Sequence, residues 1–324
     1  MPRRGDDIRY GFAVGRVMVL RTRLLGRAAY ERLLDAPTFA EQKRVLSETH
    51  FGRFIEGTQT GTDVERAIDE SLLDLHQEFL ESAGLPEPVV AFFRAPYDFA
   101  ILKAVLKARM VGVEPELPSV ALGAVPLDVF AEPAALPGPL GETARELLSD
   151  GEAVPEALDA AVDRAMFAEL QRLARLSRVP FLATLAAREA DVANAKVLLR
   201  CALARRTPEA ALAMLVPGGR WDAASLADLV RRPDELAAAV MVARVLPTPA
   251  VSDLLDVSRL DVLADGAIAA LAREASLMGI GPEQVLGYVL ARRAEAVTVR
   301  SLLVGRLAGL SRDTVAGRLR EAVS

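Results

Sequence analysis

Three carboxylates stand at matching places along the chain, and each is followed five residues later by a base. The acids are Asp98, Asp191 and Glu295, and the bases are Lys103, Lys196 and Arg300. Carboxylates that converge in one pocket can act as a general acid and a general base. An acid near the start of a helix and a base further along instead complement the helix dipole. We favour the second interpretation, because we expect all three acids near helix starts.

Residues that commonly bind metals or act as nucleophiles are scarce. The chain has two histidines, His50 and His76, and one cysteine, Cys201. These are too few for a usual four-ligand zinc site, so we interpret both histidines as ordinary solvated or half-buried side chains. Cys201 lies in the apolar segment LLRCALA with no nearby histidine to activate it, which favours a small core residue over a nucleophile. The sequence therefore predicts no catalytic, cofactor-binding or metal-binding residue.

Two segments have the composition of loops that bind ligands. Residues 57–62 read GTQTGT, but the phosphate-loop pattern GxxxxGK[ST] does not occur, and phosphate binding at this segment is the weaker interpretation. Residues 216–221 read VPGGRW and contain the only tryptophan. An exposed pair of Arg220 and Trp221 would suit a partner anchor. We favour a Trp221 side chain that closes a domain core.

Composition bounds the class of protein. A chain of 324 residues that is 52% hydrophobic can bury a large core in two or three domains. It has 39 basic and 44 acidic residues, a net charge of −5, and so no broad positive field for nucleic acid or anionic lipid. A single cysteine cannot form an intramolecular disulfide. We expect no export signal. No uncharged run reaches the roughly 18 residues that a membrane-spanning helix needs.

Apolar residues recur at helical spacing along the chain, whereas strand patterns are almost absent. Residues 10–50 predict two helices separated at residues 35–37. The second helix should begin at a capping box formed by Thr38 and Glu41. Residues 63–82 predict a further helix.

Prolines and glycines mark where helices begin and end. Several prolines interrupt residues 114–139, and Pro247 and Pro249 mark a shorter break. Pro282 suits the first position of a helix and Gly309 suits a helix stop. The predicted fold class is all-α.

The helices that carry the three acids form an internal repeat. The segments are YDFAILKAVLKAR from Tyr97, ADVANAKVLLRCA from Ala190 and AEAVTVRSLLVGR from Ala294, with core leucines at Leu106, Leu199 and Leu303. The acids are 191 − 98 = 93 and 295 − 191 = 104 residues apart, close to one third of the chain. This period predicts three similar helical domains. A chance likeness of three alanine-rich helices is the alternative.

Taken together, these segments resemble a soluble connector family of the V/A-type rotary ATPases, whose members are designated C, or d in eukaryotes. The resemblance rests on YGFAVGRVMVLRTRLL, LLDAPTFAEQKRVLSETHFG, YDFAILKAVLKAR, EADVANAKVLLR, LVPGGRW and PEQVLGYVLARRAEAVTVRSLLVGRLAGL, in the family's order over nearly the whole chain. One departure from the family is Ile101 in the first repeat. The matching position in the second repeat is Asn194, and family members often have asparagine at both positions. A polar contact of that asparagine is therefore in question in the first domain.

The resemblance implies a pseudo-three-fold funnel of three similar helical domains, which we assign to residues 1–125, 126–230 and 231–324. It implies a non-catalytic central-stalk connector that transmits torque in an H⁺ or Na⁺ transporting ATPase, without a cofactor. Its implied partners are the central shaft subunits D and F and the proteolipid ring, with no nucleic acid and no direct membrane span. The implied location is peripheral, on the cytoplasmic face of the membrane, and the partner-binding residues remain unassigned.

Two other classes of function remain open. A generic α-helical scaffold or adaptor would stack its repeats in a line rather than around an axis. An all-α enzyme would need a pocket in which perturbed acids converge. The surroundings of Asp98, Asp191 and Glu295 in the folded chain discriminate between these classes.

Overall fold

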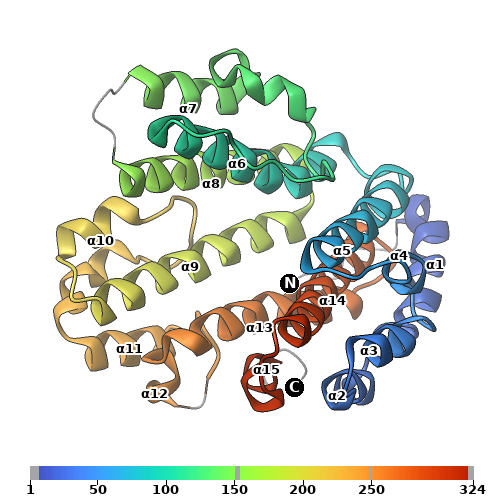
Figure 1. The fold of residues 1–324 in the computed structure, drawn as a ribbon. Helices are drawn as coiled ribbons and strands as arrows, with labels where there is room; N and C mark the ends of the chain where they lie inside the picture. The colour runs from blue at the N-terminus through green and yellow to red at the C-terminus, as the bar shows by residue number, and fades with distance from the viewer. Residues whose placement is uncertain (1–6, 150–153, 249, 320–324) are drawn as a thin grey trace. The chain divides into compact units, whose positions relative to one another are not determined.

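A computed structural model describes residues 7–149, 154–248 and 250–319. Over these ranges every regular element is a helix, and no strand occurs (Figure 1). Most elements are α-helices, joined by short 3-10 turns and one π-helical turn. The alanine- and leucine-rich composition explains this result, because both residues favour helices. The all-α prediction is confirmed.

The amino-terminal segment forms more helices than its periodicity predicted. Its elements are η1 (Ile8–Tyr10), α1 (Gly11–Arg21), α2 (Arg27–Asp35), α3 (Phe39–Leu46), α4 (Gly52–Ile55), α5 (Gly61–Leu75) and the π-helical turn η2 (His76–Glu81). The break after Asp35 is confirmed, and Thr38 caps α3 by accepting the N–H of Glu41 at 3.2 Å. The single helix expected before that break is wrong, because residues 22–26 separate α1 from α2.

The next segment contains two long helices joined by the proline-rich connection. Helices α6 (Glu87–Val111) and α8 (Pro155–Ser177) lie side by side, and α7 (Gly138–Ser149) packs against both (Figure 1). Residues 112–126 are irregular and are followed by the short turns η3 (Leu127–Ala131) and η4 (Pro133–Ala135). Proline lacks the N–H that a helix interior requires, so the predicted connection is confirmed.

Half of the eight remaining helical elements in the described ranges begin at a proline. They are α9 (Pro180–Leu203), α10 (Pro208–Met214), η5 (Ala224–Arg231), α11 (Pro233–Val242), α12 (Val251–Leu254), α13 (Val257–Ser276), α14 (Pro282–Leu307) and α15 (Arg312–Leu319). Pro282 opens α14 as predicted, since the first helical position needs no hydrogen-bonded N–H. Gly309 has a φ of 70° just after α14 and ends it as predicted. The predicted break at Pro247 separates α11 from α12, and Pro249 lies outside the described residues.

The chain groups into two compact units. One unit combines Met1–Leu85 with Asp261–Ser324, and the other is Pro86–Leu260. In the first unit α14 packs on α5 and α1, and in the second α8 packs on both α6 and α9. Both cores consist of fully buried aliphatic and aromatic side chains, among them Ile68 and Val299 in one and Phe93 and Leu182 in the other. The division into three domains stays a prediction.

Over the described part of the chain, no helix is both long enough and apolar enough to cross a bilayer.

Candidate functional site

Asp98 binds a loop with its carboxylate. It lies in the middle of α6, is buried, and accepts the backbone N–H of Ala124 at 2.9 Å and of Val125 at 3.1 Å. A Cβ atom at Gly123 would overlap the carboxylate, so the loop approaches this closely only because residue 123 is glycine. Burial raises the pKa of the Asp98 carboxyl, against the opposing effect of the two N–H groups.

Asp191 repeats the arrangement on α9. It is buried in the middle of that helix, and Oδ1 accepts the backbone N–H of Trp221 at 2.9 Å. Gly219 takes the place of Gly123, because a Cβ atom there would also overlap the aspartate. Burial again raises the carboxyl pKa, while the N–H groups of Trp221 and Arg220 oppose the shift. Two repeats thus use the same aspartate and glycine pair to bind a loop to a helix.

Glu295 does the same on α14 with a loop from the other end of the chain. It is buried, and Oε1 accepts the backbone N–H of Leu25. Its other oxygen, Oε2, lies 3.3 Å from Nε2 of His50 and 3.4 Å from Nε of Arg292. Leu25 belongs to the break between α1 and α2 that the periodicity missed. The missed break is therefore the segment that completes the third carboxylate site.

The interpretation of the three acids as helix-start residues is wrong. The structure places α6, α9 and α14 with their first residues at Glu87, Pro180 and Pro282, so each acid is near the helix centre. There the dipole of the helix ends has little effect, since it acts over the first and last turns. The acids instead satisfy loop N–H groups that burial would otherwise leave unpaired. The glycines at 123 and 219 were the sequence signal for this role.

Two of the three bases that follow the acids, Lys103 and Arg300, form ion pairs with a neighbouring helix. Lys103 Nζ on α6 lies 2.5 Å from Asp163 of α8, and Lys107 Nζ lies 2.7 Å from Asp159. The two acids of the partner helix are four residues apart and so share one face. These bases hold helix pairs together and do not face the carboxylates of the repeat.

The third repeat has the same type of ion pair. The Arg300 guanidinium on α14 lies 2.6 Å from Asp69 and 3.0 Å from Glu65, both on α5. Glu65 and Asp69 are also four residues apart. Lys196 has the corresponding place on α9. The core leucines of all three repeats, at 106, 199 and 303, are buried as expected.

The three repeats differ one helical turn after the acid. Asn194 is buried and exchanges two hydrogen bonds with the backbone of Val216, at 2.9 and 2.8 Å. Ile101 is buried at the matching position of α6, where its side chain has no polar atom. Thr298 on α14 bonds within its own helix, to the carbonyl of Ala294 at 2.9 Å. Only the repeat on α9 therefore clamps its loop with an amide.

The histidines and the cysteine lie in packed surroundings. His50 is half-buried against Phe51, and burial lowers its pKa despite the nearby Glu295. His76 is completely buried, so the expectation of an ordinary solvated or half-buried side chain is wrong for this residue. Cys201 is buried in α9, and burial raises the pKa of its thiol, as expected for a core cysteine. Within the described ranges, histidine, cysteine and carboxylate side chains form no group suited to a metal ion.

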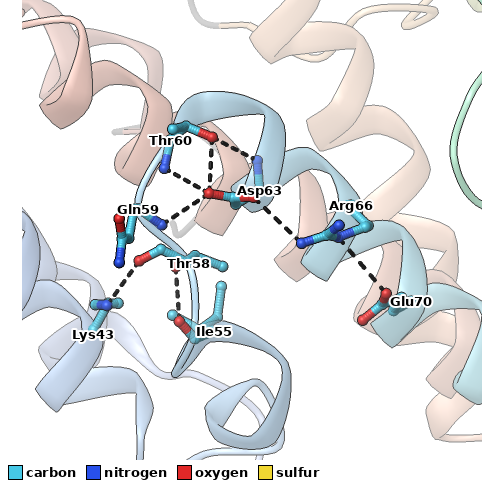
Figure 2. A network of polar contacts seen from close by, with 8 residues as sticks. All are labelled: Lys43, Ile55, Thr58, Gln59, Thr60, Asp63, Arg66 and Glu70. Atoms are coloured by element: carbon cyan, nitrogen blue, oxygen red, sulfur yellow. Dashed lines mark hydrogen bonds and ion pairs between the residues drawn. The ribbon is translucent and has the colours of Figure 1, made fainter.

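Nearby side chains of the same chain bind the backbone groups of the loop at residues 57–62. Figure 2 shows the Asp63 carboxylate accepting from the N–H groups of Gln59 and Thr60 while Thr60 accepts the N–H of Asp63. Lys43 donates to the carbonyls of Glu56 and Thr58 in the same place. The capping box therefore puts a carboxylate where a phosphate would have to bind, since it uses the same N–H groups.

Trp221 is half-buried, and Arg220 beside it is exposed. The backbone N–H of Trp221 donates to Asp191, and Asn194 binds the same loop at Val216. The expectation that the side chain closes a core is therefore met only in part.

Two sequence comparisons show which known proteins this chain is similar to. The chain matches the sequence model described as ATP synthase (C/AC39) subunit over residues 13–318. It is similar to the C subunit of a V-type sodium ATPase from Enterococcus hirae, with 22% identity over 316 residues that cover 92% of this chain and 94% of the relative. The match spans all three carboxylates and the loops that they bind.

Proposed function

Because the chain belongs to the ATP synthase (C/AC39) subunit family, we propose that it is the central-stalk connector of a V/A-type rotary ATPase. In this role it links the shaft subunits D and F to the proteolipid ring on the cytoplasmic face of the membrane and transmits torque between them. It has no catalytic activity of its own, as is typical of this accessory family. The name of its relative in Enterococcus hirae supports the assignment to such a complex.

The observation that carries the proposal is the recurrence of a buried carboxylate that fixes a loop to the centre of a long helix. Asp98, Asp191 and Glu295 each bind a loop N–H group at the same place in the repeat. Loops held by buried hydrogen bonds do not flex independently of the helices, because breaking such a bond leaves a buried polar group unpaired. A connector that transmits torque needs this internal rigidity.

The three repeats are similar but not identical, and a connector between a symmetric ring and an asymmetric shaft needs both properties. We propose that residues 1–125, 126–230 and 231–324 are three similar domains around one axis. A ring of identical subunits can be contacted by three similar domains, but an asymmetric shaft requires contacts that differ among them. Ile101, Asn194 and Thr298 occupy one buried repeat position, so their exchange shows that the repeats differ inside, while the residues that contact the shaft stay unassigned.

Reassembly of the complex tests this proposal. The rotary ATPase is prepared without this subunit, and the purified chain is added back. We expect the chain to bind both the shaft subunits and the detergent-solubilised ring, to restore ion pumping driven by ATP hydrolysis, and to hydrolyse no ATP alone. A chain that binds neither partner, or pumping that is complete without it, would contradict the connector role.

A further inference from the structure

Helix α1 is apolar on two opposite sides. On one side Val14 and Val17 are buried in the unit. On the other side Ile8, Phe12 and Val19 are 84%, 80% and 59% exposed. These three positions are four and seven residues apart, so they form one stripe along η1 and α1. Exposed apolar side chains gathered in one stripe are typical of a surface that binds a partner, so the outer side of α1 has the composition of an interface.

This stripe is held in a fixed position at both ends. The N–H of Asp7 donates to the carbonyl of Ile280 at 2.7 Å, just before the stripe begins. At the other end the Arg21 guanidinium donates to the carbonyls of Ser276 and Gln284 at 3.2 and 3.1 Å. A surface that is already ordered loses little conformational entropy on binding, which favours its use in recognition.

The charge beside the stripe indicates the chemistry of the partner. Residues 8–30 contain five arginines and no acid, in a chain whose net charge is −5. Arg9 and Arg16 are seven residues apart and border the stripe on one side, with side chains 79% and 41% exposed. Arg9 pairs with Asp7 and Arg16 pairs with Glu78, both guanidinium groups also lie over aromatic rings, and a guanidinium has five N–H donors. The border can therefore bind further carboxylates.

We propose that the outer face of α1, formed by Ile8, Phe12 and Val19 with Arg9 and Arg16 at its edge, binds an amphipathic helix of another subunit of the complex. The partner helix has an apolar stripe bordered by carboxylates. Burial of the two apolar stripes drives binding, and the guanidinium–carboxylate pairs set the register. This inference rests on the proposed function, because it presumes the other subunits of a rotary ATPase.

Two other occupants have to be compared with an acidic helix. A second copy of the same face would meet Arg9 and Arg16 with arginines and would supply few carboxylates. An anionic lipid surface would also bring negative charge to Arg9 and Arg16, and the vesicle measurement below separates it from a protein partner. An acidic helix of a partner protein satisfies both the stripe and its border.

The test uses the full chain and the rotary ATPase prepared without it. The double variant Phe12→Ser/Val19→Ser removes two of the three apolar side chains of the stripe, and the matched control Val242→Ser/Leu277→Ser changes two other exposed residues, 80% and 88% exposed. We expect the first variant to rebind the complex at least tenfold more weakly than the wild type and the control to rebind normally. Both variants should keep the wild-type melting temperature, because none of the four side chains is buried. Arg9→Glu should also weaken rebinding.

The outcomes separate this inference from the proposed function. If the wild type rebinds and the Phe12→Ser/Val19→Ser variant rebinds equally well, the α1 face is not the docking surface and the inference is wrong. Binding of the wild type to phosphatidylglycerol vesicles, or its dimerisation in analytical ultracentrifugation, would overturn the inference if the same variant abolished it and left rebinding intact. A wild type that does not rebind at all would remove the proposed function as well.

Discussion

The side chain of Glu295 accepts the backbone N–H of Leu25, which joins the middle of α14 to a loop 270 residues earlier in the chain. The corresponding bonds of Asp98 and Asp191 reach loops that follow them by 26 and 30 residues. The third repeat is therefore closed by the amino-terminal segment, although 270 residues of chain separate Leu25 from Glu295. Substitutions around these three carboxylates should therefore change the free energy of unfolding.

Replacement of Glu295 tests the bond that closes the third repeat. Glu295→Ala leaves the Leu25 N–H and the buried Arg292 side chain without their partner, and we expect a loss of about 3–5 kcal/mol in the free energy of unfolding. Glu295→Gln keeps an oxygen for Leu25 and should cost less. Urea denaturation gives both values, and hydrogen exchange should show faster exchange at the Leu25 amide. Equal stabilities for Ala and wild type would exclude a stabilising role.

Gly123 and Gly219 test the close approach of loop and helix. A methyl group at either position overlaps the aspartate carboxylate, so Gly123→Ala and Gly219→Ala should each destabilise the protein by about 1–3 kcal/mol. Gly57→Ala is the matched control, because nothing lies within 4 Å of a Cβ atom there. Thermal melts of the three variants give the comparison. A loss at residue 57 equal to that at 123 would contradict the steric explanation, because Gly→Ala in open space lowers the entropy of the unfolded chain and should not destabilise.

His50 predicts a pH dependence of stability. Its folded-state pKa is below the ordinary value of 6.5 because of burial, so the unfolded chain takes up a proton first as the pH falls. The stability that neutral His50 contributes is complete above pH 6.5. It is lost as the pH falls from there towards the folded-state pKa. His50→Gln should remove this slope from a plot of unfolding free energy against pH. A slope that persists in the variant would assign it to another group.

The ion pairs between helices should contribute little to the free energy of unfolding. A double-mutant cycle of Arg300→Met with Asp69→Asn should give a coupling energy of about 0.5–1 kcal/mol, because both side chains are partly exposed to solvent. The same cycle for Arg172 and Glu169, a pair within one helix, should give about 0.3–0.5 kcal/mol. Chemical denaturation measures both. A coupling above about 3 kcal/mol at Arg300 would mean that this pair determines helix packing.

Cys201 should be unreactive in the folded chain. Its thiol is buried and its pKa is raised, so little thiolate is available to a disulfide reagent. We expect labelling with Ellman's reagent only on unfolding in guanidinium. Val242→Cys provides a matched exposed thiol in the same chain and should label at once. Rapid labelling of wild-type Cys201 would show that α9 opens in the native state.

Much of the local structure could be predicted from residue patterns. Helical spacing of apolar residues identified the all-α class, and Thr38, Pro282 and Gly309 marked helix ends, because capping and backbone preference act over a few residues. The alignment of Asp98, Asp191 and Glu295 placed three equivalent positions correctly. The break at residues 22–26 was missed, since arginines and leucines continue the helical pattern across it.

The groups that the three carboxylates bind depend on long-range folding. Every residue except proline has a backbone N–H, so the sequence does not indicate which N–H group a distant carboxylate will bind. The glycines at 123 and 219 are a partial signal for two sites, and the loop at Leu25 has none. Residue order alone placed the acids at equivalent positions of three helices. Their function as acceptors was set by tertiary folding, because it depends on which loop is brought within hydrogen-bond distance.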